Sequence, residues 1–331
     1  MSSQPNGFRF TVAAACAGSR LDAAVAAEIE CCSRSFAATL IRRGLITVNG
    51  SGKKPGYVLR EGETVCGTIP PPEAPDFRPE EIPLHILYED AELVVIDKPP
   101  GMVVHPAPGH SGGTLVNALA YHCPDLAGIS GSLRPGIVHR LDKDTSGVLV
   151  AAKNGISMQH LAAQFKSRQV RKRYLALVYG VPESDAGTID LPIGRHPVDR
   201  KKMSVTTRTP RSALTHWKVR ESFVGASLLE VDIRTGRTHQ IRVHCHAMGH
   251  PVIGDPVYCR RGEKKRLASV APCMAQSVGD AARQMLHAWK LTFLHPKTGK
   301  TLTVEAPVPA DMSALIAEFR RWTPTREFDN R

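Results

Sequence analysis

Residues 136–154 read GIVHRLDKDTSGVLVAAKN, two apolar runs joined by a polar turn. The run at 137–141 and the fully apolar run at 148–152 are expected to form two strands, with the polar residues between them as a tight loop. This arrangement would place Asp142 at the mouth of a buried hairpin, with Arg140 two residues back on the same strand face. The stretch therefore predicts a carboxylate and a guanidinium together at the rim of a sheet.

A carboxylate at such a rim loses part of its hydration, and a cationic partner would keep it ionised and nucleophilic at neutral pH. The pattern equally fits a structural turn in which Asp142 bonds its own backbone and faces solvent. Spacing alone favours neither interpretation.

A second informative segment, LLEVDIRTGRTHQIRVHCHAMGHPVIGDPVY, spans residues 228–258. Alternating apolar residues at its start predict a half-buried strand, and a Thr-Gly turn then opens a short helix from about Thr238 to Met248. Arg237 and Arg242 lie at or near the start of that helix. The segment could therefore supply the basic partner that the first one needs.

Charge and composition indicate the kind of partner. Of the 331 residues, 42% are hydrophobic and 22% charged, a balance typical of a globular protein with an ample core. The 43 Lys and Arg exceed the 31 Asp and Glu, and a formal net charge of +12 predicts a polyanionic partner, RNA or DNA before a membrane. Most of this excess lies between Gln164 and Glu221, where thirteen Lys and Arg accompany four Asp and Glu.

Cysteine usage and hydropathy indicate the compartment. Eight cysteines occur without a CxxC pair, and no apolar stretch approaches the roughly 20 residues of a membrane helix. We therefore expect a reduced, cytoplasmic protein with no membrane segment.

Four histidines of the second segment, His239, His244, His246 and His250, raise the question of a metal site. The spacing argues against one, since residues two apart diverge on a helix, Gly249 interrupts the last pair, and no HExxH arrangement occurs. We expect these histidines to be structural or to face nucleic acid, with no metal bound.

Six prolines between residues 70 and 83, in PPPEAPDFRPEEIP, predict an extended linker. It would separate a small N-terminal domain, residues 9–69, from a large domain, residues 84–322. In the small domain, two short helices over about residues 20–44 precede strands with Asn-Gly and Glu-Gly turns. The basic residues on and beside the second helix are either a solvated face or contacts to nucleic acid.

The small domain resembles the S4-like RNA-binding domain, first recognised in a small-subunit ribosomal protein. The resemblance rests on the order of its segments, with RLD at 20–22, SRS at 33–35, VNG at 48–50 and GETV at 62–65. It implies that RNA phosphates are contacted by Arg34, Arg42, Arg43, Lys53 and Lys54.

Three motifs of the large domain, HRLDKDTSG at 139–147, KRYLALVYG at 172–180 and TGRTHQIRVH at 235–244, resemble the signatures of the RluA family of pseudouridine synthases. The resemblance implies the α+β pseudouridine synthase fold, a mixed, mostly antiparallel sheet with flanking helices and loops. It also implies an enzyme that isomerises uridines of ribosomal RNA, in particular large-subunit RNA, to pseudouridine without a cofactor. We expect such an enzyme to act as a monomer.

The resemblance also implies roles for individual residues. Asp142 matches the family's nucleophile, Arg242 its basic partner, and Tyr174 the residue that stacks on the flipped uracil. Arg140 matches the residue that fills the gap when the uridine leaves the RNA stack. Further RNA contacts are implied for Arg171, Lys172, Arg173, Arg237 and His239.

Residues 262–283 follow no pattern of the family, and we expect them to form a loop over the RNA face. Two other functions fit parts of the sequence. A non-catalytic RNA-binding or ribosome-assembly factor would keep the fold, but the intact set of Asp142, Tyr174 and Arg242 argues against it. A hydrolase could use Asp142 and Asp144 as an acid–base pair, but their place in one tight loop gives no reason for opposed positions.

Overall fold

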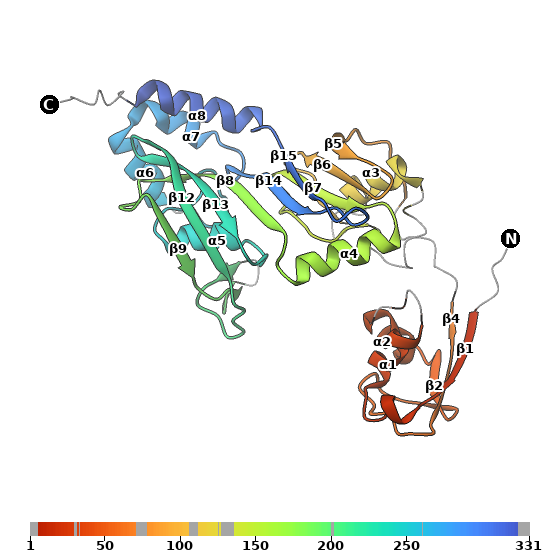
Figure 1. Ribbon diagram of the computed structural model, residues 1–331. Coiled ribbons are helices and arrows are strands. Elements are labelled where there is room, and N and C mark those ends of the chain that lie inside the picture. Colours follow the sequence, from red (N-terminus) through yellow and green to blue (C-terminus); the bar gives the residue numbers. More distant parts are fainter. Residues whose placement is uncertain are drawn as a thin grey trace. The chain divides into compact units, whose positions relative to one another are not determined.

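The computed structural model describes residues 6–29, 32, 34–70, 78–105, 112–124, 126, 136–199, 202–259 and 261–323. The chain divides into two compact units, which we call the N-terminal unit (residues 1–78 with 124–135) and the large unit (residues 79–123 with 136–331) (Figure 1). Most of the stretch predicted to be a linker, residues 71–77, lies outside the described residues.

The N-terminal unit packs two helices against a small antiparallel sheet. Its elements are β1 (Asn6–Thr11), a 3-10 turn η1 (Ala14–Cys16), α1 (Leu21–Glu28), α2 (Arg34–Arg42), β2 (Ile46–Val48), β3 (Ser51–Gly52) and β4 (Thr64–Ile69). The strand order is β1-β4-β2-β3, and Leu21, Leu40 and Val65 are fully buried in the core between sheet and helices. The predicted Asn-Gly turn joins β2 and β3, and both of its residues adopt positive φ.

The large unit is built on one mixed sheet. Its strands are β5 (His85–Glu89), β6 (Leu93–Lys98), β7 (Ser146–Ala152), β8 (Arg171–Tyr179), β9 (Ala186–Asp190), β12 (Leu214–Phe223), β13 (Ala226–Ile233), β14 (Leu286–Leu294) and β15 (Thr301–Glu305). They follow the order β5-β6-β7-β14-β8-β13-β12-β9, with β15 paired to β14. Only the β7–β14 pair is parallel among these described strands. A separate ribbon joins β10 (Gly194–Arg195) to β11 (Met203–Ser204).

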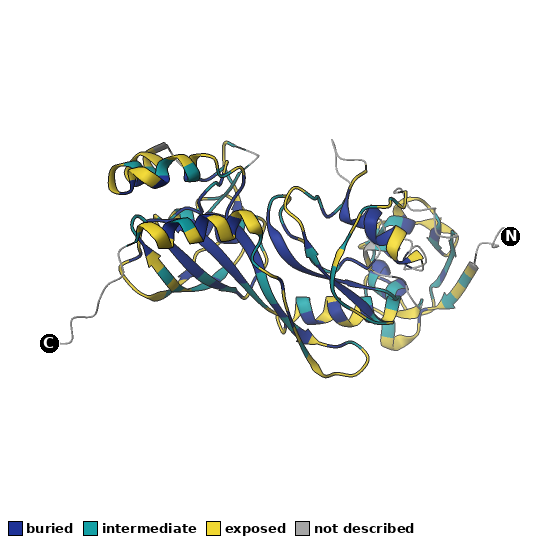
Figure 2. Ribbon diagram, turned by 90° about the horizontal axis from the view of Figure 1, so that it is seen from above, coloured by how far each residue is buried: buried dark blue, intermediate teal, exposed yellow. Residues whose placement is uncertain are grey.

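Helices cover the sheet and bury its apolar faces. They are α3 (Leu115–His122), α4 (Gly155–Lys166), α5 (Gln240–Ala247), α6 (Arg261–Val270), α7 (Ala275–Gly279) and α8 (Ala310–Trp322), with a 3-10 turn η3 (Pro272–Met274). One apolar cluster joins α4 to β6, β7 and β14, and a second joins α6, α7 and α8 to β8 and β13. Figure 2 shows the buried strands between helices whose outer faces are exposed. The α+β fold expected from the sequence is confirmed.

The expected strand at residues 137–141 does not form. Only Ile137 makes a bridge, to Ala151 of β7, and the chain beyond it is irregular. The backbone N–H of Val150, which would bond a neighbouring strand, instead donates to Nε2 of His139 at 3.0 Å. The side chain of His139 thus takes the place of one backbone acceptor of a strand ladder, and the segment lies beside β7 without becoming a strand.

The expected loop at residues 262–283 is also wrong, because most of this segment is helical in α6, η3 and α7. Leu267, Met274 and Val278 are buried in the cluster beneath α8. These three residues lie on three separate short elements divided at Pro272, so no continuous apolar repeat marked the segment as helical. In the part of the chain that the structure describes, no helix has both the length and the apolarity to cross a membrane.

Gly147 allows β7 and β14 to approach at their parallel pairing. Its φ is +110°, and a Cβ atom there would overlap the backbone of Ala288. We expect Gly147→Ala to lower the free energy of unfolding by more than about 2 kcal/mol, because neither backbone can move without breaking the sheet. The matched control is Gly155→Ala at the start of α4, where a Cβ meets no atom within 4 Å. Equal urea midpoints for the two variants would contradict this prediction.

Candidate active site

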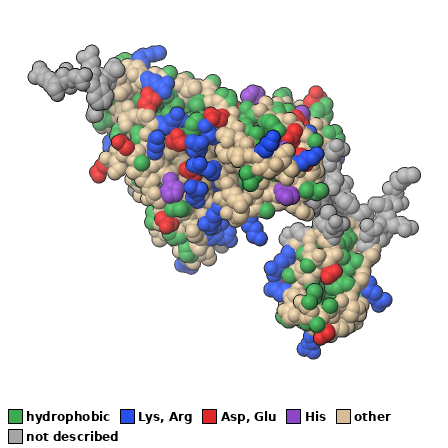
Figure 3. All heavy atoms as spheres, in the orientation of Figure 1, with side chains coloured by type: hydrophobic (Ala, Val, Ile, Leu, Met, Phe, Trp, Pro, Cys, Tyr) green, Lys and Arg blue, Asp and Glu red, His purple; other side chains and the backbone are tan. Residues whose placement is uncertain are grey.

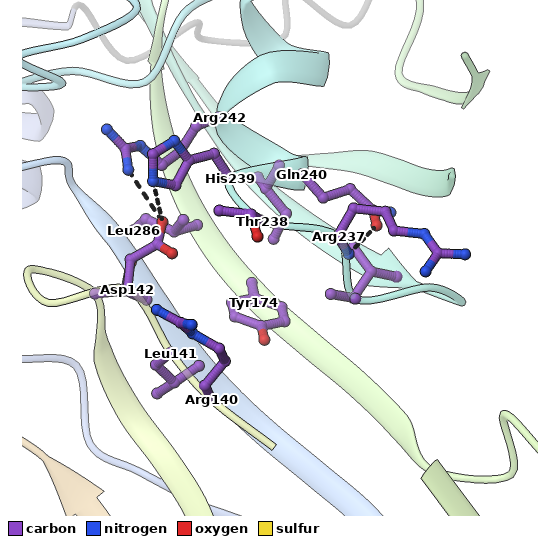
Figure 4. A pocket seen from close by; sticks show the side chains of 14 residues that line it. Arg140, Leu141, Asp142, Tyr174, Arg237, Thr238, His239, Gln240, Arg242 and Leu286 are labelled. Atoms are coloured by element: carbon purple, nitrogen blue, oxygen red, sulfur yellow. Dashed lines mark hydrogen bonds and ion pairs between the residues drawn. The ribbon is translucent and has the colours of Figure 1, made fainter. Parts of the chain in front are cut away.

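A pocket lies where the segment before β7, strand β8 and the first turn of α5 meet (Figure 4). Its volume of about 90 Å³ is well below the roughly 300–1,000 Å³ of pockets for drug-sized ligands, so it suits one small planar ring. Asp142, Tyr174, Arg242 and Arg140, which the sequence assigned to the reaction, all line it. So do two of the predicted RNA contacts, Arg237 and His239.

Two buried cations hold the loop that carries Asp142. Nζ of Lys98, at the end of β6, donates to the carbonyl oxygen of Lys143 in the loop at 2.9 Å. It also donates to the carbonyl oxygens of Pro99 and Met102, in the turn that follows β6. Nη1 of Arg283 donates to the carbonyl oxygen of Asp144 at 3.1 Å. Burial lowers the pKa of Lys98 to about 8, and its three acceptors match the three protons of an ammonium group. The loop therefore keeps its shape without a strand ladder.

Arg242 on α5 lies between two carboxylates. Its Nη1 donates to Oδ2 of Asp142 at 3.0 Å, while Nε and Nη2 make a bidentate contact with Asp255 at 2.6 and 2.9 Å. Arg242 is 4% exposed and Asp255 is 3% exposed, whereas the Asp142 side chain is 21% exposed. Asp255 thus anchors Nε and Nη2 of the guanidinium inside the protein, and Nη1 is left to face the pocket.

The charges of this triad support each other. Burial alone would lower the pKa of Arg242, but the hydrogen bonds and charges of both carboxylates raise it above its usual value. Burial alone would raise the pKa of Asp255, but Arg242 and two backbone N–H groups bring it below its usual value. Among the described residues, no donor contacts Oδ1 of Asp142. One carboxylate oxygen is therefore held, and the other is open to a substrate.

Tyr174 and Arg140 occupy the pocket differently. Tyr174 on β8 is 8% exposed, and burial, reinforced by the charge of Asp142, raises its pKa well above the usual value. The phenol is therefore neutral at neutral pH, and its hydroxyl can donate or accept a proton in a hydrogen bond. Arg140 is exposed at the rim. The structure therefore brings Arg140 and Asp142 into one pocket even though their segment is not a strand.

The turn before α5 is fixed by Gln240. Its side chain accepts from the hydroxyl of Thr235 at 2.8 Å and from the backbone N–H of Arg237 at 3.0 Å, and it donates to Thr215 on β12. His239, between them, has a φ of 56°, a left-handed conformation that non-glycine residues rarely adopt. The turn thereby directs both His239 and Arg242 at Asp142, as Figure 4 shows.

The structure separates the three basic residues at the start of β8. Lys172 shares the face of Tyr174, and its ammonium group approaches Gly236 of the pocket wall. Arg171 and Arg173 point to the opposite face, where they pair with Asp232 at 3.6 Å and with Glu230 at 3.2 Å. Their role in binding RNA stays a prediction.

The five cations of the N-terminal unit were predicted to contact RNA, and this too stays a prediction. Nε of Arg34 lies 3.3 Å from Oδ2 of Asp22, whose pKa falls to about 2 because Arg20 and then Arg34 donate to it. Arg34 remains 57% exposed, so the ion pair orients its guanidinium without hiding it. Lys53 lies over the ring of Tyr57, while Arg42, Arg43 and Lys54 are exposed.

One group of described residues has the composition of a metal site. Ligand atoms of Glu89, His122 and Cys123 lie within 4.8 Å of one another, away from the pocket. Lys153 already donates to Glu89 at 2.8 Å and neutralises its charge. The four histidines considered from the sequence are not part of this group. His244, for example, contacts Thr215 and a backbone carbonyl.

Sequence reasoning missed three residues that support the site: Lys98, Asp255 and Arg283. Lys98 follows the buried run LVVID, and a charged residue there is a signal that it bonds buried carbonyl groups. No comparable signal exists for Asp255 or Arg283. Each lies more than 100 residues from Asp142 in the chain, and only the pairing of β14 with β7 and the position of α5 bring them together.

Family models match two parts of the chain. Residues 92–247 match the RNA pseudouridylate synthase family, and residues 19–65 match the S4 domain. The first match contains Asp142, Tyr174 and Arg242, and the second contains the predicted RNA contacts of the N-terminal unit.

Relatives and solved structures agree with these matches. The chain is 45% identical to "Uncharacterized RNA pseudouridine synthase YlyB" of Bacillus subtilis, over 91% of this chain and 94% of the relative. It is 43% identical to "Ribosomal large subunit pseudouridine synthase D" of Nitrosomonas europaea, over 95% and 88%. The structure of "Human RNA Pseudouridylate Synthase Domain Containing 1" superposes with a TM-score of 0.56 at 26% identity, covering 74% of this chain and 98% of the human one.

The position of Arg242 between two carboxylates leads to a stability prediction. Asp255→Ala should lower the free energy of unfolding by about 3–5 kcal/mol, because a buried guanidinium loses its bidentate partner. Asp142→Ala should cost much less, because Asp142 is partly exposed and Arg242 keeps Asp255. Urea unfolding of both variants tests this. Equal losses would show that Asp255 does not anchor the arginine.

Proposed function

The chain belongs to the RNA pseudouridine synthase family, and on this premise we propose that it isomerises specific uridines of large-subunit ribosomal RNA to pseudouridine. The observation that carries the proposal is the pocket in which Asp142, held by Arg242 through one oxygen, faces the ring of Tyr174. A ribosomal RNA substrate also supports a location of the protein in the cytoplasm.

The reaction breaks the bond between N1 of uracil and C1′ of ribose, turns the base, and joins C5 to C1′. C5 loses a proton and N1 gains one, so atoms and electrons balance without a redox partner. Asp142 can begin by attacking C1′ or by removing the proton at C2′. Both routes need an ionised carboxylate with an open oxygen, and Oδ1 meets that requirement.

Base flipping is the second requirement. Removing a uridine from the stack costs a few kcal/mol. Arg140, exposed at the rim, can occupy the space that the base leaves. Stacking on Tyr174 can return about 1–3 kcal/mol, and its neutral hydroxyl is available to assist the loss of the C5 proton.

Positive charge supports the RNA partner. In Figure 3, Lys and Arg side chains form a band across the visible face of the large unit, over the region of β8 and β14 in Figure 1. At the pocket itself, Lys172 and Arg237 can contact the phosphates that flank the flipped uridine. Arg34, Arg42, Arg43, Lys53 and Lys54 are the proposed contacts of the N-terminal unit, and Arg171 and Arg173 are further proposed contacts.

Tritium release from RNA labelled at C5 of uridine tests the proposal. We expect release from large-subunit but not small-subunit ribosomal RNA transcripts, and a fall of at least about 100-fold in Asp142→Asn with RNA binding retained. The matched control is Asp144→Asn in the same loop, which should retain release because Asp144 does not line the pocket. RNA binding without release by the wild type would favour a non-catalytic factor, and release by Asp142→Asn would exclude the mechanism.

A further inference from the structure

Tyr258 contacts the active site from outside the pocket. Its hydroxyl oxygen lies 2.9 Å from Nδ1 of His239 and accepts the backbone N–H of Met203 at 2.9 Å. Its ring stands edge-on to His239 and lies 5.2 Å from the guanidinium of Arg242. Tyr258 therefore contacts both residues that face Asp142.

The hydrogen-bond partners of Tyr258 favour one position for the imidazole proton of His239. The N–H of Met203 can only donate, so the Tyr258 oxygen accepts it, and the phenol proton remains to be placed. Nδ1 of His239 is the only acceptor within hydrogen-bond distance of that proton among the described residues. Only with Nδ1 as acceptor do both the phenol proton and Nδ1 have a partner among the described residues.

His239 is neutral as well as oriented. Burial lowers the pKa of His239. The charge of Asp142 raises it by a smaller amount, and the guanidinium of Arg242 lowers it further, so the net shift is downward. A neutral imidazole carries one proton, and with Nδ1 accepting, that proton is on Nε2. Nε2 lies 3.9 Å from Oδ2 of Asp142, the same oxygen that Arg242 contacts (Figure 4).

We propose that Tyr258 holds His239 as the Nε2–H tautomer, which makes His239 a second donor to Oδ2 of Asp142 while Oδ1 reacts. The 3.9 Å separation is longer than a hydrogen bond, and such contacts tighten when substrate closes a site. The left-handed backbone of His239 is consistent with a residue held in place for function. Tyr258 is a positioning residue in this scheme. The inference rests on the proposed function only for its effect on turnover.

Substitutions at position 239 separate the two ring nitrogens. In His239→Gln the side-chain amide can donate from near the position of Nε2, whereas in His239→Asn it reaches only the position of Nδ1. Asparagine tolerates the left-handed backbone at least as well as histidine, so the Asn variant should fold. We expect turnover to fall at least about 10-fold in His239→Asn and to recover most of the wild-type value in His239→Gln. Any loss of a direct RNA contact by His239 would raise the KM for RNA in both variants alike, so the difference in turnover between them reports the Nε2 position.

Tyr258→Phe removes the hydroxyl and keeps the ring on Arg242. We expect a similar fall in turnover at unchanged KM. Tyr88→Phe is the control, because the Tyr88 hydroxyl bonds Asp90 away from the pocket. Nitrogen-15 NMR of the full chain labelled at histidine should show His239 as the Nε2–H tautomer in the wild type, and as a mixture in Tyr258→Phe.

The outcomes separate this inference from the proposed function. An Nδ1–H tautomer in the wild type, or unchanged turnover in Tyr258→Phe, would overturn it even if tritium release is normal. A loss of turnover in Tyr258→Phe with an unchanged tautomer would overturn it too. If the wild type releases no tritium, the proposed function fails, and the NMR spectra still decide whether Tyr258 sets the tautomer.

Discussion

The ion pair between Arg242 and Asp142 depends on a second carboxylate, Asp255, which is buried and does not line the pocket. A lone buried guanidinium would be strongly destabilising, and a bidentate contact with Asp255 removes that cost. Because Asp255 uses Nε and Nη2, Arg242 reaches Asp142 through Nη1 alone. Asp142 is thereby held and oriented through Oδ2, while Oδ1 stays open to the pocket.

Buried cations stabilise the irregular backbone that carries Asp142 and so hold its ion pair with Arg242 in place. Backbone carbonyl groups away from water need donors, and the loop after Asp142 has no strand beside it to supply them. Lys98 and Arg283 supply them instead, from the strand before the loop and from the start of the segment that becomes β14. The parallel pairing of β14 with β7, which Gly147 permits, brings Arg283 to the loop. The antiparallel pairing of β6 with β7, in which Lys98 lies opposite Gly147, brings Lys98 there.

Short-range patterns predicted the parts of this architecture that are local. The motifs around Asp142, Tyr174 and Arg242 identified the pocket residues. The Asn-Gly turn and the helices α1, α2 and α5 followed from spacing, whereas α3 and α8 were not predicted. The strand at 137–141 was wrong because alternation cannot show that His139 takes the place of a ladder bond. Asp255 was missed because its partner is set by tertiary contact. The helices of 262–283 were missed because α6 and α7 are short and Pro272 separates them, so no apolar repeat runs through the segment.

The sequence also could not show on which face of the sheet each basic residue lies. Composition established a basic chain, and that excess predicted a polyanionic partner. Composition cannot assign a charge to a face, because neighbouring residues of a strand point in opposite directions. Lys172 shares the pocket side with Tyr174, while Arg171 and Arg173 pair with acidic residues of β13 on the other side. If a uridine binds in the pocket as proposed, Lys172 lies on the same side of the sheet as that base, and the two arginines lie on the other side.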